Sequence, residues 1–196
     1  MSARTGLPVG RRPQQRTSSS TDSSGVLLAF YSRAGENYWY GGRRVLDVGS
    51  TEVVSGLIAD RVDCDLFRIE ADQPYPVDYE ETVARNVREQ DVDARPGIAT
   101  PLPDTTRYSA VILASPVWNV RPPMIMSTFV EGVDLSGTTV LPVVSYAVSG
   151  LGRTMEVYRD LAPDAVLGDG LAVRGEEAAG AGPAVEEWLA RVLPGT

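Results

Sequence analysis

Short apolar runs alternate with helical patterns along most of the chain. Five runs are rich in branched and aromatic residues and predict strands, at residues 26–31, 65–69, 110–115, 139–145 and, less distinctly, 166–173. The first of them, Val26 to Tyr31, has the composition of a buried strand. Each run is followed by a segment whose apolar residues recur at helical spacing, so strands and helices take turns along the sequence.

The helical segments carry recognisable start signals. Ser50 and Thr51 offer hydroxyls at a helix cap and Glu52 places a carboxylate in the first turn. Apolar residues then recur on one face, at Val53, Val54, Leu57 and Ile58. Further helices are predicted over residues 79–89, from the Pro122-Pro123 pair onward, and over 152–161 and 183–193.

Five strands that alternate with five helices predict a doubly wound α/β fold. In this fold a five-stranded, mostly parallel sheet carries helices on both faces. We expect one such domain over residues 26–196. The helix over residues 79–89 is charged, with Val83 and Val87 on one stripe.

Residues 1–25 are different in character. They are rich in Ser, Arg, Pro and Gly and lack apolar periodicity, which predicts a disordered N-terminal tail. The Arg11-Arg12 pair is reminiscent of a twin-arginine export signal, but no apolar region of the required length follows it within this segment, so a truncated leader stays the alternative to a plain tail. No run approaches the ~20 apolar residues of a membrane helix, and a single cysteine, Cys64, excludes an internal disulfide. We therefore expect a soluble, cytoplasmic protein.

Charge and composition narrow the possible chemistry. The chain has a net charge of −8 although its first 25 residues hold four arginines and one aspartate, so the domain itself is strongly acidic. An acidic domain argues against nucleic acid or membrane as a partner and permits docking to a basic protein surface. The absence of histidine excludes Ser-His-Asp and Cys-His nucleophiles and His-containing zinc sites. We therefore expect neither a catalytic side chain of those classes nor a metal site. Redox chemistry would have to come from a bound cofactor.

Ligands of doubly wound sheets bind beyond the carboxyl ends of the strands, so the loops at those ends matter most. The loop after the first strand contains Ser32, Arg33 and Ala34, and it can present backbone N–H groups, a hydroxyl and a positive charge to a phosphate. It matches neither the GxxxxGK[ST] pattern of nucleotide triphosphate sites nor the GxGxxG pattern of dinucleotide sites.

The loops after the third and fourth strands offer aromatic planes. In the first of these, Trp118 is placed to lie flat on a planar ligand, while Asn119 can bond the ligand's edge. The other loop adds the ring of Tyr146 and a turn that permits close backbone approach at Ser149 and Gly150. A phosphate socket with two aromatic planes indicates a site for a phosphorylated planar heterocycle.

These three loops, in this order, resemble the flavodoxin family. The resemblance spans about residues 26–193 and is strongest to a branch whose loops read PxWxxxPP after the third strand and SGxG after the fourth. It implies noncovalent binding of FMN, with the phosphate in the first loop and the isoalloxazine ring between the other two. The implied cofactor-binding residues are Ser32, Arg33 and Ala34 around the phosphate, Pro116, Val117, Trp118 and Asn119 on the inner ring wall, and Ser145, Tyr146, Ser149 and Gly150 on the outer wall.

One departure from the family pattern concerns the phosphate loop. In the family, the first loop leads directly into the first helix, whereas here residues 36–48 stand between Gly35 and Gly49. The departure suggests a split site, with Ser32 on one side of the phosphate and Ser50 and Thr51 on the other. Three roles stay open for the inserted residues: a lid, a partner surface or plain packing.

The resemblance implies electron transfer through FMN, with a reductase and an acceptor protein as partners. Two alternatives stay open at this point. One is an NAD(P)H-dependent flavin or quinone reductase on the same fold. The other is a flavodoxin-like interaction module without flavin, because a fold alone does not establish a function.

Overall fold

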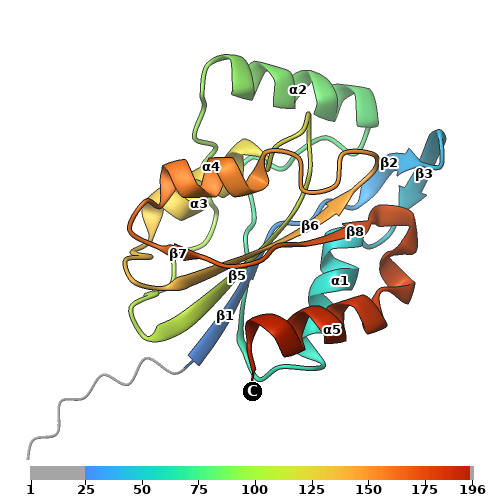
Figure 1. The fold of residues 1–196 in the computed structure, drawn as a ribbon. Helices are drawn as coiled ribbons and strands as arrows, with labels where there is room; N and C mark the ends of the chain where they lie inside the picture. Colours follow the sequence, from blue (N-terminus) through green and yellow to red (C-terminus); the bar gives the residue numbers. More distant parts are fainter. Residues whose placement is uncertain (1–24, 195–196) are drawn as a thin grey trace, which may run out of the picture.

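The computed structural model describes residues 25–194 and has a parallel sheet at its centre (Figure 1). The strands lie in the order β4-β1-β5-β6, and both β7 and β8 pair with β6. Their bounds are Gly25–Phe30 (β1), Asp65–Arg68 (β4), Tyr108–Pro116 (β5), Thr139–Tyr146 (β6), Val166–Leu167 (β7) and Leu171–Arg174 (β8). The predicted α/β fold with a parallel sheet is confirmed.

The fifth predicted strand is interrupted rather than continuous. Val166 pairs with Thr139 and Leu171 with Val143, so β7 and β8 follow one another along the same edge of β6. The interruption is occupied by Asp169, whose carbonyl oxygen accepts a hydrogen bond of 2.9 Å from the indole N–H of Trp188. A buried indole needs such a partner, and the break in the strand leaves the Asp169 carbonyl oxygen free to provide it.

Helices cover both faces of the sheet, with α1 and α5 on one face and α3 and α4 on the other (Figure 1). The five predicted helices are all present, with ends shifted by a few residues. They are α1 (Ser50–Ala59), α2 (Tyr79–Asp91), α3 (Met124–Gly132), α4 (Thr154–Leu161) and α5 (Gly182–Val192), and a 3-10 helix, η1 (Gly175–Gly180), precedes α5.

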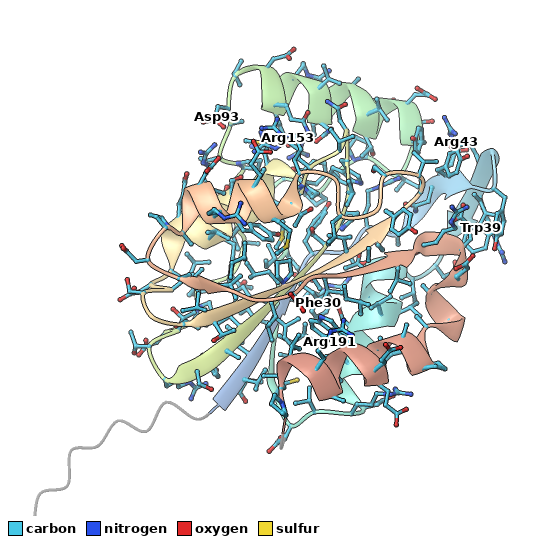
Figure 2. All side chains as sticks on the ribbon, in the orientation of Figure 1. Phe30, Trp39, Arg43, Asp93, Arg153 and Arg191 are labelled. Carbon is cyan, nitrogen blue, oxygen red and sulfur yellow. The ribbon has the colours of Figure 1, made fainter. Side chains whose placement is uncertain are left out.

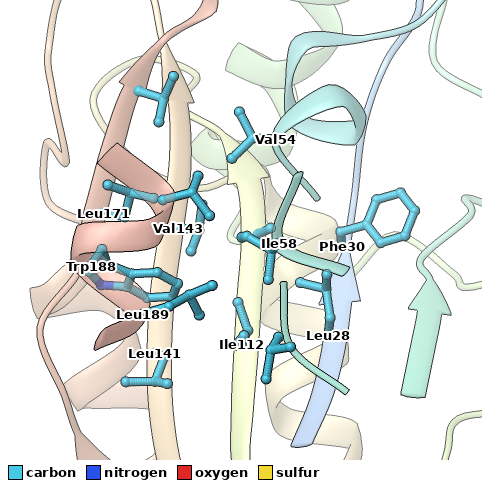
Figure 3. Packing of buried hydrophobic residues seen from close by; sticks show 14 of the residues in the cluster. Leu28, Phe30, Val54, Ile58, Ile112, Leu141, Val143, Leu171, Trp188 and Leu189 are labelled. Atoms are coloured by element: carbon cyan, nitrogen blue, oxygen red, sulfur yellow. The ribbon is translucent and has the colours of Figure 1, made fainter. Parts of the chain in front are cut away.

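Two hydrophobic clusters, one on each face, hold these layers together. Leu28 of β1 and Ile112 of β5 point toward α1 and α5, where they meet Ile58 and Trp188 (Figure 3). The neighbouring Leu27 belongs to the cluster on the other face, against α3 and α4. Because strands buried on both faces need apolar residues at consecutive positions, the strands appear in the sequence as unbroken apolar runs.

A β-hairpin, which the sequence analysis did not predict, occupies the segment between β1 and α1. Its strands β2 (Gly35–Trp39) and β3 (Gly42–Leu46) form a separate antiparallel sheet. Tyr40 and Gly41 both have positive φ, 46° and 88°, as a two-residue hairpin turn of type I′ requires. The turn is tethered to η1, because the Tyr40 N–H donates to Glu176 Oε1 over 2.8 Å.

Trp39 and Arg43 lie on opposite faces of the hairpin, because Arg43 pairs with Tyr38 and Trp39 pairs with Gly42 (Figure 2). The guanidinium of Arg43 lies 3.6 Å from the ring centroid of Tyr79 and 2.8 Å from a carboxylate oxygen of Glu80, both on α2. The hairpin therefore bridges η1 and α2 across the edge of the sheet where the strands end.

The prediction for residues 1–25 lies outside the described residues, except that Gly25 begins β1. Within residues 25–194, the longest helices are too short and too polar to cross a membrane.

Substitution of Ile112 by alanine should lower the free energy of unfolding by about 2–5 kcal/mol, because it leaves a cavity in the central strand where the side chain is fully buried. Urea unfolding followed by circular dichroism would measure the loss. Val92→Ala is the control, since that side chain is 75% exposed and its removal should change stability by less than about 0.5 kcal/mol. Equal losses in both variants would contradict this packing.

Candidate functional site

A pocket opens where β1, β5 and β6 end, and we call it the strand-end pocket. It brings together nine of the predicted site residues: Ser32, Arg33, Ser50, Thr51, Pro116, Val117, Trp118, Ser145 and Tyr146. The other four, Ala34, Asn119, Ser149 and Gly150, are not among its lining residues. Six lining residues were not predicted: Asn37, Tyr38, Tyr79, Ala147, Gly175 and Glu176.

The two halves of the split loop meet at the start of α1. The N-cap residue is Gly49, which has no side chain to cap the helix, and the Ser32 hydroxyl takes that role by accepting a hydrogen bond of 3.1 Å from the Glu52 N–H. A Cβ atom on Gly49 would lie 2.3 Å from Ser32 Oγ and 2.5 Å from the carbonyl oxygen of Arg33. Only glycine therefore allows this close approach.

The first turn of α1 is suited to an anion. The N–H groups of Ser50 and Thr51 lack intrahelical partners because of their position, and the helix dipole adds a partial positive charge there. The hydroxyl of Thr51 is buried and lies 2.6 Å from the hydroxyl of Ser145 at the end of β6. Backbone and hydroxyl donors thus converge at one end of the pocket.

Arg33 also has a structural role that the sequence analysis did not predict. Its guanidinium donates to the carbonyl oxygens of Pro76 and Val77, over 2.8 and 3.0 Å, and to that of Glu36. Arg33 thereby ties the first loop to the hairpin and to the segment before α2. Burial lowers the pKa of Arg33, yet a guanidinium stays protonated in proteins. No carboxylate of residues 25–194 forms a salt bridge with it, so its positive charge remains available to the pocket.

Trp118 is held by an aromatic cluster beneath the pocket. Its ring lies edge-on to those of Tyr31 and Tyr75, with centroids 5.7 and 5.1 Å away. The Tyr75 hydroxyl donates to Glu89 over 2.7 Å, and the guanidinium of Arg85 lies 3.8 Å from the centre of the Tyr75 ring. Burial raises the pKa of both tyrosines, so the support beneath Trp118 stays uncharged.

The loop after β5 contains a strained turn. Asn119 and Val120 have φ of 50° and 61°, while the Trp118 N–H donates to the Arg121 carbonyl oxygen over 2.8 Å. Positive φ is unfavourable for a β-branched residue, so Val120 is held there by its surroundings. Its carbonyl oxygen accepts a 2.7 Å hydrogen bond from the Arg153 N–H, which links this loop to the loop after β6.

Two of the predicted residues that do not line the strand-end pocket, Asn119 and Ser149, make other contacts. The side-chain amide of Asn119 donates to Gln90 of α2 over 2.7 Å, which directs it to a second hollow beside the strand-end pocket. Ser149 belongs to the turn of the loop after β6, where its carbonyl oxygen accepts from the Gly152 N–H over 3.0 Å.

Glu176 contributes a carboxylate that sequence reasoning missed. One oxygen accepts the hydrogen bond from Tyr40, and the other is buried without a hydrogen-bond partner among the described residues. With its neighbour Gly175 it lies in η1, far along the chain from the three predicted loops, and no local pattern marks it. A buried acceptor of this kind suits a ligand hydroxyl.

Comparison with known proteins identifies the family and the fold. The family model described as Flavodoxin matches residues 46–192. A search of curated proteins finds no match.

Solved structures with the same fold include three flavoproteins. A putative flavoprotein from Bacteroides uniformis has a TM-score of 0.68 at 22% identity, covering 85% of this chain and 97% of its own. One from Bacteroides eggerthii has a TM-score of 0.67 at 24% identity, covering 86% and 98%. A flavoprotein from Lactobacillus acidophilus, solved in complex with FMN, has a TM-score of 0.59 at 16% identity, covering 84% and 98%. At these identities the likeness shows the fold.

Replacement of Val120 by glycine should raise the free energy of unfolding by about 1 kcal/mol, because glycine adopts positive φ without the steric cost that valine incurs. Chemical unfolding would measure the gain. Val148→Gly is the matched control in the neighbouring loop; its φ is not positive, so added chain entropy should make that variant less stable. A loss of stability in both variants would contradict the strain at Val120.

Proposed function

The chain belongs to the flavodoxin family, and we propose that it binds FMN noncovalently in the strand-end pocket and carries electrons between protein partners. The observation that carries the proposal is the convergence of anion donors and aromatic side chains in one pocket. Ser32 and the first turn of α1 lie at one end, and Trp118 and Tyr146 line the same pocket. A phosphorylated planar cofactor needs both features at once.

The anion end accounts for the phosphate of FMN. The N–H groups of Ser50 and Thr51 would donate to its oxygens, and the Ser32 hydroxyl, which accepts from the Glu52 N–H, still has its own proton to donate. The unneutralised charge of Arg33 would favour the phosphate dianion from a greater distance. We also propose that the backbone of Ala34, in the loop after β1, contacts the phosphate.

The remaining residues account for the rest of the cofactor. Trp118, held by Tyr31 and Tyr75, would cover one face of the ring, and Tyr146 would cover the other. The free oxygen of Glu176 would accept a hydrogen bond from the ribityl chain. FMN supplies the redox chemistry when bound, while these residues bind it, orient it and exclude water.

Electron transfer to proteins is proposed on the basis of charge and composition. The chain has a net charge of −8 and no histidine to act as a general acid or base. The negative net charge of the chain would steer it toward basic patches on a reductase and on an acceptor protein. Three residues of the loops after β5 and β6 do not line the pocket but stay proposed contacts of FMN: Asn119, Ser149 and Gly150.

The purified chain, stripped of flavin, should bind FMN at least about 100-fold more tightly than riboflavin, because the phosphate adds two or more charge-assisted hydrogen bonds of about 1.5–3 kcal/mol each. Titration followed by flavin fluorescence quenching would give both affinities. Equal affinities would show that the phosphate end does not bind phosphate, and failure to bind either ligand would favour an interaction module without flavin.

Gly49→Ala should weaken FMN binding by at least about 10-fold, since the new methyl group separates the Ser32 loop from α1 and removes one or more of those hydrogen bonds. Gly56→Ala, in the same helix, is the matched control because a Cβ there meets nothing within 4 Å. That variant should bind FMN normally and gain about 0.5–1 kcal/mol in stability. Thermal unfolding of both variants separates a local effect from loss of the fold, and normal FMN affinity in a folded Gly49→Ala variant would contradict the proposed geometry.

A further inference from the structure

A second hollow lies beside the strand-end pocket, between α2 and the Trp118 loop, and we call it the α2 hollow. Its volume is about 340 Å³. It shares five residues with the strand-end pocket, Arg33, Asn37, Tyr79, Val117 and Trp118. Its other walls come from Thr82, Val83, Asn86 and Val87 of α2 and from Asn119. A volume of this size is large enough for a small aromatic molecule.

The orientation of α2 is the unusual feature of this hollow. The residues that α2 buries include the polar Thr82 and Asn86, whereas its apolar stripe of Val83 and Val87 is 38% and 40% exposed. The sequence places these valines on one stripe, which in a surface helix normally faces the core. Here the stripe faces the α2 hollow, so apolar side chains line an open cavity next to the proposed flavin site.

The electrostatic character of the hollow is also distinctive. Although the chain is acidic, no Asp or Glu is among the ten lining residues, and the single charged residue is Arg33. The Arg33 guanidinium already donates to three backbone carbonyl oxygens. The hollow therefore suits a neutral ligand better than a cation or a ligand with several phosphates.

Several side-chain hydrogen-bond donors in the hollow have no acceptor among the described residues, and they include Arg33 Nε, Asn86 Nδ2 and the Tyr79 hydroxyl. Asn86 is 3% exposed; its Oδ1 accepts from Gln90 over 3.2 Å, but its Nδ2 donates to no described group. The Tyr79 hydroxyl likewise makes no hydrogen bond within residues 25–194, although the Tyr79 ring is fixed by Arg43. The side-chain amides of Asn37 and Asn119 already donate, to the Gly35 carbonyl oxygen and to Gln90 Oε1. The unused donors call for a ligand with acceptor oxygens.

We propose that the α2 hollow binds a quinone, a neutral planar ring with two carbonyl oxygens. Val83 and Val87 would contact its faces and ring substituents, Trp118 would contact it from the side of the strand-end pocket, and Asn86 and Tyr79 would donate to its oxygens. A nicotinamide dinucleotide fits less well because its diphosphate would need more cationic groups than the single arginine that lines the hollow. A role for the quinone as electron acceptor rests on the proposed function, whereas its binding does not.

The test is an NMR titration of the isotope-labelled chain with 2,3-dimethyl-1,4-naphthoquinone, in which methyl groups occupy both quinone-ring carbons to which the Cys64 thiol could add. Saturable shifts of the α2 backbone amides and of the Asn86 side-chain amide are expected, with affinities that agree within about threefold in the flavin-free and FMN-loaded forms. No shifts, shifts elsewhere, or loss of quinone binding when FMN is present would overturn the proposal. So would NADH shifting these amides while the quinone does not.

Variants give a second line of test. Val83→Glu with Val87→Glu adds two carboxylates to the wall and should weaken quinone binding at least 10-fold while FMN affinity stays unchanged, since neither valine lines the strand-end pocket. Val166→Glu is the control, because Val166 is 57% exposed and pairs with the first residue of β6, at the opposite edge of the sheet. Tyr79→Phe removes only a hydroxyl and should weaken quinone binding about threefold or more. Unchanged quinone affinity in both the double variant and Tyr79→Phe would overturn the proposal.

These measurements keep the two proposals apart. A chain that binds the quinone at α2 but not FMN would contradict the proposed function and leave this site standing. A chain that binds FMN and shows no quinone shifts would contradict this site alone.

Discussion

The close contact between Gly49 and the Ser32–Arg33 loop is the constraint on which the site depends. It brings the end of β1 against the first turn of α1 although the hairpin separates them along the chain. The Ser32 hydroxyl then caps a helix that has no capping side chain of its own. One contact therefore closes the split loop, satisfies the helix terminus and creates the group of donors that we propose for phosphate.

The aromatic side of the site depends on a chain of supports that ends in α2. Trp118 rests on Tyr75, and Tyr75 is bonded to Glu89, which also accepts a 2.7 Å hydrogen bond from Arg85. The same helix turns its apolar stripe toward the α2 hollow. Its orientation thus serves two purposes, since it positions the tryptophan and lines the proposed quinone site. On the buried side of α2 the Thr82 hydroxyl donates to the carbonyl oxygens of Pro76 and Asp78, while Val83 and Val87 stay partly exposed.

Most of the fold could be predicted because each sheet strand is buried on both faces and each helix has a clear apolar face or start signal. The hairpin was missed because Tyr40-Gly41 is a weak turn signal and the strands carry mixed polar and aromatic residues. The three loops were placed correctly, since parallel strands end at one edge, but some of the contacts that their side chains make were not predicted. Arg33 bonds carbonyl groups of the segment before α2, and Glu176 approaches from η1; both are long-range contacts that no local pattern reveals.

The measurement that tests the central claim most directly is the ¹⁵N–¹H spectrum of the flavin-free chain with and without FMN, and with riboflavin as the ligand that lacks the phosphate. Our account predicts that FMN shifts the backbone amides of Ser32, Ser50 and Thr51 strongly and that riboflavin leaves them nearly unchanged. Binding of FMN with no change at these three amides would contradict the claim that the Ser32 loop and α1 together hold its phosphate.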